Sequence, residues 1–149
     1  MRFDRVSNKH LGELLVERGV INRIQLEEAL EHQKNNKGVL FGEALVKLGH
    51  ATEVDIAQAM TCQYGFPYLP LANYEIDPEV LSSVPVSICE QFCLIPIDKI
   101  GKSLTLAMAN PLNIKAVEDV ELLSGCAVQA FVSTVSDIRG AIKKYYGLL

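Results

Sequence analysis

The chain has 149 residues, of which 49% are hydrophobic and 21% charged, with a formal net charge of −4 and a mean hydropathy of +0.18. This apolar content excludes a disordered chain, and the sequence has no apolar run of about 18 residues that would span a membrane. The acid excess is spread out, with 8 basic against 9 acidic residues in 1–66 and 6 against 9 in 67–149. Neither half therefore has the basic surface on which DNA or RNA binding depends.

The first elements in the chain belong to two copies of one segment. HLGELLVERGVINRIQLEEALEHQ (residues 10–33) aligns with LFGEALVKLGHATEVDIAQAMTCQ (residues 40–63) at a constant offset of 30 residues. Each copy predicts a short helix, a glycine that permits a left-handed turn, and a longer helix. Residues 8–65 contain no proline, so we expect four helices in two hairpins.

Capping residues place the starts of the two longer helices. We expect Asn22 to cap a helix from Arg23 to about Lys34, and Thr52, with Asp55 three residues later, to cap its counterpart. The apolar positions of these helices should face the core. They are Ile24, Leu26, Ala29 and Leu30 in the first copy, and Val54, Ile56, Ala57, Ala59 and Met60 in the second.

The composition changes near residue 66, because all six prolines lie beyond it. We therefore divide the chain into a helical tandem-repeat subdomain, 1–66, and an α+β subdomain, 67–149. The second contains a small mixed sheet of three to four strands, which we expect to have helices on one face. Its expected elements are an extended piece at 68–71, short helices at 78–83 and 86–91, strands at 93–99 and 103–108 joined by a turn at 100–102, a helix at 114–123 ended by Gly125, a strand at 126–133, and a helix at 135–146 capped by Thr134 or Ser136.

The sequence contains no recognisable catalytic constellation or phosphate-binding loop, so we expect a chain that is not an enzyme. The four cysteines, Cys62, Cys89, Cys93 and Cys126, lack the paired spacing of a zinc site and are expected to be buried free thiols. Glu28 and His32 stand one helical turn apart, an arrangement much commoner on solvated helix faces than at a metal. We expect no metal and no cofactor.

The duplicated pattern resembles the MshEN domain, the N-terminal regulatory domain of the GspE- and PilB-like ATPases of type II secretion and type IV pilus assembly. That family carries two motifs of the form R-L-G-x-x-L-x-x-x-G-x-x-x-x-x-x-L-x-x-x-L-x-x-Q. The specified positions are His10, Leu11, Gly12, Leu15, Gly19, Leu26, Leu30 and Gln33 in the first copy, and Leu40, Phe41, Gly42, Leu45, Gly49, Ile56, Met60 and Gln63 in the second. LIPIDKIGKSLTLAMANPLNIKAVEDVELLSG and the closing IKKYYGLL resemble the family's companion subdomain.

The resemblance implies that these sixteen residues bind cyclic di-GMP, with each motif taking about half of the ligand. The sequence departs from the family pattern where His10 and Leu40 replace the motif arginines, and where Asn110-Pro111 stands in place of a frequent Asp-Pro. Arginine offers a permanent charge and a planar set of donors that histidine and leucine lack. The alternative implied by the family is a protein-docking domain whose nucleotide site has been lost.

The resemblance also implies partners and a location. The partners are ATPase domains in the same or another chain and the cytoplasmic segment of an inner-membrane secretion or pilus protein. Neither DNA, RNA nor direct membrane insertion is expected. The location is cytoplasmic, peripheral to the inner membrane through the protein partner, which agrees with a charged amino-terminal sequence unlike a secretory signal.

Overall fold

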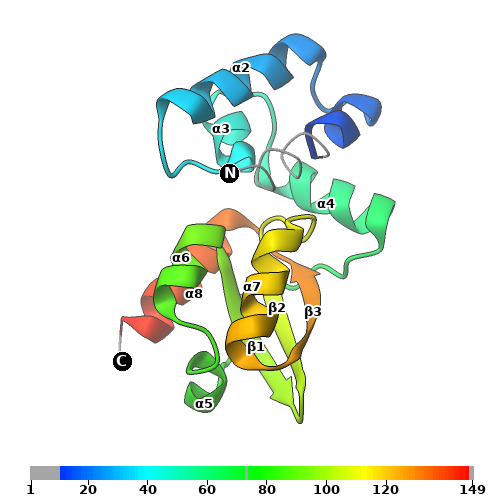
Figure 1. Ribbon diagram of the computed structural model, residues 1–149. Helices are drawn as coiled ribbons and strands as arrows, with labels where there is room; N and C mark the ends of the chain where they lie inside the picture. Colours follow the sequence, from blue (N-terminus) through cyan, green and yellow to red (C-terminus); the bar gives the residue numbers. More distant parts are fainter. Residues whose placement is uncertain (1–10, 73, 148–149) are drawn as a thin grey trace.

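The computed structural model describes residues 11–72 and 74–147, and its helical half (residues 11–66) lies above the α+β half (residues 67–147) in Figure 1. Both predicted caps are confirmed. Asn22 Oδ1 accepts a hydrogen bond from the Gln25 backbone at 2.8 Å, and Thr52 Oγ1 accepts one from the Asp55 backbone at 3.1 Å. Residues 11–17 are helical, and they are followed by α2 (Arg23–Asn35), α3 (Phe41–Lys47) and α4 (Glu53–Tyr64).

The two sequence copies repeat one another in backbone geometry. Gly19 and Gly49 both have left-handed φ values, 75° and 76°. The following residue closes the turn in both copies, because Val20 N donates to Leu15 O and His50 N donates to Leu45 O, each at 2.9 Å. The duplication therefore extends from the sequence to the backbone conformation of the helix–turn–helix unit.

Two of the residues expected to face the core are exposed. Ile24 and Val54, which occupy the same position in the two copies, are 71% and 54% exposed. They precede the buried Leu26 and Ile56 by two residues, which is a rotation of about 200° around a helix. Because Leu26 and Ile56 face inward, the residue two positions earlier faces solvent.

The α+β half contains a three-stranded mixed sheet of order β1-β2-β3 within the described residues. Strands β1 and β2 pair antiparallel, and β2 and β3 pair parallel. The helix α7 connects β2 to β3 in the chain. This confirms the α+β fold class. The elements are α5 (Pro78–Leu81), α6 (Val86–Phe92), β1 (Leu94–Ile100), β2 (Ser103–Met108), α7 (Ile114–Ser124), β3 (Ala127–Val132) and α8 (Val135–Tyr146).

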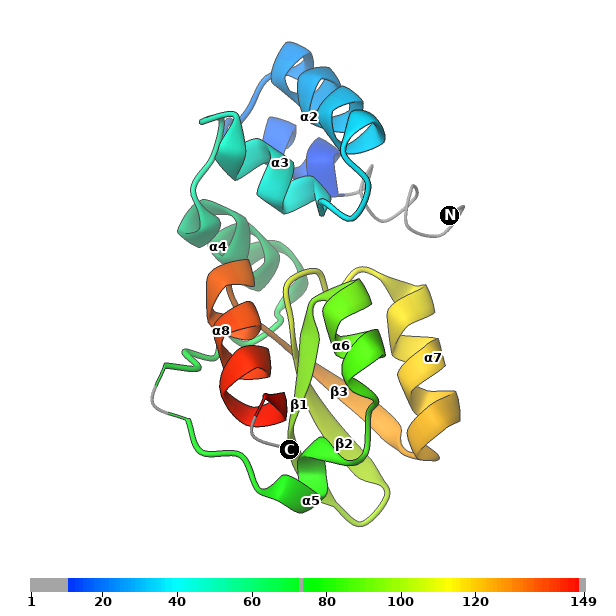
Figure 2. The same ribbon diagram turned by 90° about the vertical axis from the view of Figure 1, so that its left-hand side faces the viewer.

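Helices cover both faces of the sheet, so the expectation of helices on one face was wrong. The first four residues of β1 are all buried, a pattern typical of a strand enclosed on both sides. Ile95 and its cross-strand partner Ala107 are fully buried on one face, as are Leu94 and Met108 on the other. Figure 2 shows the strands between α8 on one side and α7 on the other.

The buried residues form one cluster in each half. The helical cluster includes Leu15, Leu45 and Met60, and the α+β cluster is centred on the sheet. The Val132 side chain, at the end of β3, packs in the helical cluster and so links the two halves, while its backbone bonds to Pro67 and Leu69 hold the start of the α+β half against β3. The subdomain boundary after residue 66 stays a prediction. None of the described helices has the length and apolar character needed to cross a bilayer.

Three of the four cysteines are buried as expected, but Cys62 is exposed. Cys62 lies on α4 outside the buried stripe formed by Ile56, Ala57, Ala59 and Met60. The sequence pattern alone did not separate it from the buried thiols. Burial raises the pKa of Cys89 to about 11 and that of Cys93 to about 12. The charge of Arg139 lowers the pKa of Cys93, but desolvation outweighs it.

We expect one thiol per native chain to react rapidly with Ellman's reagent near pH 8, because thiolate is the reactive form and only Cys62 is accessible. After unfolding in urea, all four cysteine thiols of the sequence should react rapidly. Cys62→Ser should abolish the rapid reaction of the native chain and leave only the slow reaction of the buried thiols. A second thiol that reacts rapidly in the native chain would contradict the burial of the other three.

Candidate functional site

A cavity of about 520 Å³ lies between the helical half and the α+β half. Its volume falls within the range of about 300–1,000 Å³ that is usual for small-molecule sites. The walls come from α3 and the start of α4 on one side, and from α6, the loop before α7, and the start of α8 on the other. Six of the sixteen motif residues line it, namely Leu11, Gln33, Leu40, Phe41, Gly42 and Ile56.

The other motif residues lie elsewhere. Leu15, Leu45 and Met60 are fully buried in the helical core, so they have no surface to offer a ligand. Gly19 and Gly49 form the left-handed turns described above. Among the described motif residues, Gly12, Leu26, Leu30 and Gln63 are not part of the cavity wall. His10 lies outside the described residues.

Gly12 and Gly42, the first glycines of the two motifs, each face a side chain on the second helix of their own copy. A Cβ added at Gly12 would collide with the Leu26 side chain and lie 3.2 Å from Phe41 Cζ. A Cβ at Gly42 would meet Ile56 Cδ1 at 3.4 Å, which is ordinary contact. The requirement for glycine is therefore much stricter in the first copy than in the second.

Charged residues that the sequence analysis missed lie in the cavity wall, and the first pair joins α3 to α8. Glu43 Oε1 accepts a hydrogen bond from Arg139 Nη2 at 2.8 Å and another from the Leu40 backbone N–H at 3.1 Å. The Glu43 side chain is 19% exposed and that of Arg139 46% exposed. Because the two residues are 96 positions apart, no local pattern could have brought them together.

A second carboxylate joins α4 to the start of α8. Glu53 Oε1 accepts hydrogen bonds from Ser136 N at 2.9 Å and from Ser136 Oγ at 2.8 Å. Its negative charge is favoured there, because the amino-terminal end of a helix carries partial positive charge. Thr134, rather than Ser136, caps α8 through the Asp137 backbone N–H. Glu43 and Glu53 thus tie the second repeat to α8.

Two asparagines line the cavity from the loop before α7. Asn110 Oδ1 accepts a hydrogen bond from Leu112 N at 3.1 Å, and Asn113 Oδ1 accepts one from Ala116 N at 3.2 Å and so caps α7. Asn110 stands where the family pattern often has aspartate. Its amide brings the cavity both a donor and an acceptor without adding a third carboxylate to Glu43 and Glu53.

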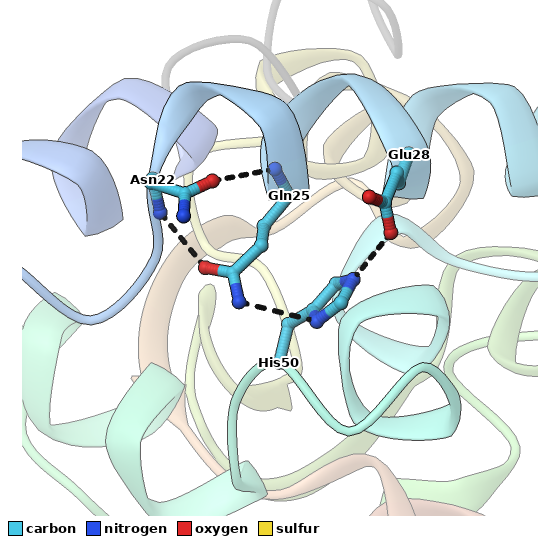
Figure 3. Close-up of polar contacts among 4 residues, drawn as sticks. All are labelled: Asn22, Gln25, Glu28 and His50. Atoms are coloured by element: carbon cyan, nitrogen blue, oxygen red, sulfur yellow. Dashed lines mark hydrogen bonds and ion pairs between the residues drawn. The ribbon is translucent and has the colours of Figure 1, made fainter.

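A largely exposed polar network connects the two sequence copies (Figure 3). Asn22 N donates to Gln25 Oε1 at 2.9 Å, which orients the Gln25 amide so that its Nε2 donates to His50 Nδ1 at 3.3 Å. His50 Nε2 lies 2.9 Å from Glu28 Oε2. A neutral imidazole with its proton on Nε2 satisfies both contacts. Across residues 11–72 and 74–147, there is no group of three His, Cys, Asp or Glu residues arranged to hold a metal.

The sequence model of the MshEN domain family matches residues 64–149, more than half of the chain. The chain belongs to the MshEN domain family. The match begins directly after Gln63, the last residue of the second motif. The match of the family model therefore rests on the α+β half, which lies outside the duplicated motifs. The resemblance of the two motifs supports the same family from the helical half.

This MshEN domain is 38% identical over 136 residues to the type IV pilus assembly ATPase PilB of Myxococcus xanthus, with 91% of this chain and 24% of that protein covered. The chain thus spans about a quarter of that relative. A structure of MshE with cdg is similar at a TM-score of 0.69 and 26% identity, covering 91% of this chain and 98% of that one. The N-terminal domain of XpsE has the same fold, with a TM-score of 0.72 at 22% identity over 95% and 96% of the two chains.

Proposed function

We propose that this MshEN domain binds cyclic di-GMP in the cavity between its halves, as the regulatory and docking domain of a type IV pilus or type II secretion ATPase. The observation that carries the proposal is the cavity itself, which six motif residues line in a fold similar to that of MshE with cdg. ATP hydrolysis belongs to other domains of the assembly. The proposed location is the cytoplasmic side of the inner membrane, through a protein partner.

The lining has the chemistry that a guanine dinucleotide needs. Leu40 and, to a smaller extent, Ile56 offer apolar surface to the flat faces of the bases, and the Gln33 amide carries both donors and an acceptor for a base edge. Cationic side chains in the wall bring positive charge for the two phosphates. A ligand held by both halves stabilises the arrangement in which it binds best, which is a physical basis for regulation.

Isothermal titration of the chain with cyclic di-GMP tests the proposal, and we expect a dissociation constant of about 10 μM or tighter, a binding free energy of roughly −7 kcal/mol or more. Cyclic di-AMP, which lacks the guanine edges, should bind more weakly. Failure to detect binding at about 100 μM cyclic di-GMP, a binding free energy weaker than roughly −5.5 kcal/mol, would contradict the proposal.

Gln33 and Gln63 form a matched pair for the same titration. They occupy the same motif position, but Gln33 lines the cavity whereas Gln63 is exposed elsewhere. Gln33→Ala should weaken binding by about tenfold, the effect of losing one hydrogen bond worth about 1.4 kcal/mol. Gln63→Ala should leave it unchanged. Equal losses in the two variants would place the ligand outside this cavity.

A docking domain with a lost nucleotide site is the second candidate, and the absence of arginine at residues 10 and 40 favours it. It predicts that the chain retains the cytoplasmic segment of an inner-membrane platform protein in a pull-down with purified components, with or without cyclic di-GMP. Retention that changes with cyclic di-GMP would favour the regulatory function instead.

A further inference from the structure

We infer that Arg139 is the phosphate-recognising residue of the cavity and that Glu43 is its internal competitor. A phosphate entering the cavity exchanges the Arg139–Glu43 ion pair for an Arg139–phosphate pair. This inference rests on the proposed function and adds to it a ligand-binding residue from outside the two motifs, together with a contact that the ligand breaks.

The position of Arg139 suits it to this role. It projects from α8 into the cavity wall, where it and Lys47 are the cationic residues among those described. Glu43 Oε1 engages Nη2, but 46% of the Arg139 side chain remains exposed. A guanidinium has five N–H donors in a planar array, which fits a phosphate through two parallel hydrogen bonds. Arg139 therefore supplies the chemistry that His10 and Leu40 do not provide at the motif positions.

Glu43 can release Arg139 without being left unpaired. Its Oε1 also accepts the hydrogen bond from the Leu40 backbone N–H at 3.1 Å, which caps α3 and does not depend on Arg139. The carboxylate is 19% exposed, so water can reach it when the guanidinium leaves. The exchange therefore replaces one anion partner of Arg139 by another, at little cost in buried charge.

The exchange changes one of the two polar contacts described above between the second repeat and α8. The Glu43–Arg139 pair links α3 to α8 and is lost on binding, whereas the Glu53–Ser136 hydrogen bonds link α4 to α8 and do not involve the cavity cations. A bound phosphate thus frees α3 from α8 while α4 remains attached. Occupancy of the cavity is in this way converted into a change in how the two halves are held together.

Two substitutions with opposite expected effects test the inference by isothermal titration with cyclic di-GMP. Arg139→Gln should weaken binding by about 10- to 100-fold, because charge-assisted hydrogen bonds are worth about 1.5–3 kcal/mol. Glu43→Gln should strengthen it by about three- to tenfold, because the amide keeps the acceptor for the Leu40 backbone but no longer neutralises Arg139. In the Arg139→Gln background, Glu43→Gln should bring no gain.

Glu53→Gln is the matched control, since it removes a carboxylate from the same cavity wall without releasing Arg139. Equal strengthening by Glu43→Gln and Glu53→Gln would show a general charge effect and overturn the exchange. Unchanged affinity in Arg139→Gln overturns this inference alone, while no binding by the unmodified chain overturns the proposed function with it. If Arg139→Gln does not fold, as judged by circular dichroism, Arg139→Lys should fold and bind more weakly, and unchanged affinity there has the same consequence.

Discussion

Replacing Leu45 with alanine is expected to lower the free energy of unfolding by about 2–5 kcal/mol, the range for large-to-small substitutions in a core. The Leu45 side chain is fully buried in the helical cluster, where Leu15, Phe41 and Met60 are also enclosed. Domains of this size have a total stability of about 5–15 kcal/mol, so the loss is a large share of it. Urea unfolding followed by circular dichroism measures the change.

Leu40→Ala is the matched control, because Leu40 also occupies a motif position and is also a leucine. It is only partly buried and lines the cavity, so its truncation should cost about 1 kcal/mol or less of stability. Under the proposed function it should weaken cyclic di-GMP binding, whereas Leu45→Ala should affect binding only through stability. Equal losses of stability in the two variants would contradict the division of the motif into core and cavity residues.

The elements were predictable because their signals are local. Asn22, Thr52 and Thr134 are cap residues that accept backbone hydrogen bonds three residues later, and the left-handed Gly125 ends α7 as expected. The register of the duplication predicted the second helix–turn–helix unit from the first. Each capping signal lies within about four residues of the bond it makes, which is the range of helix capping.

The wall of the cavity that the α+β half forms could not be predicted, because it depends on contacts between segments that are distant in the sequence. Glu53 and Ser136 are 83 residues apart, and Glu43 and Arg139 are 96 apart. Charged residues on helices are usually solvated, so a sequence pattern does not reveal which of them meet across the two halves of the chain. Arg139 appears in the sequence only as an ordinary cation near the start of the last helix.

The motif pattern itself does not distinguish core residues from ligand-facing ones. Leucine at a helical spacing is required both by a buried stripe and by an apolar cavity wall. In this chain the first motif contributes Leu11 and Gln33 to the cavity, whereas the second contributes its opening residues and Ile56. Two similar copies therefore face different surroundings, because the second copy contacts α8 through Glu43 and Glu53.

This difference between the copies leads to the second large expected effect, at the motif glycines. Gly12→Ala should be less stable than Gly42→Ala by about 1–3 kcal/mol, the usual cost of overpacking a core. The new methyl group at residue 12 collides with Leu26, which is only 4% exposed, and lies 3.2 Å from Phe41 Cζ. At residue 42 it makes an ordinary contact with Ile56 Cδ1 at 3.4 Å.

Comparing the stabilities of Gly12→Ala and Gly42→Ala isolates the collision, because the entropic effect of replacing glycine with alanine is common to both sites. Alanine lowers the backbone entropy of the unfolded chain equally at the two positions, a gain of about 0.4–1 kcal/mol. We therefore expect Gly42→Ala to raise the unfolding midpoint in urea slightly and Gly12→Ala to lower it. Leu26→Ala, introduced together with Gly12→Ala, should remove the collision, so the double variant should be more stable than the sum of the single effects predicts. Equal midpoints for Gly12→Ala and Gly42→Ala would mean that Leu26 moves aside at no cost, and that the first glycine is not required by packing.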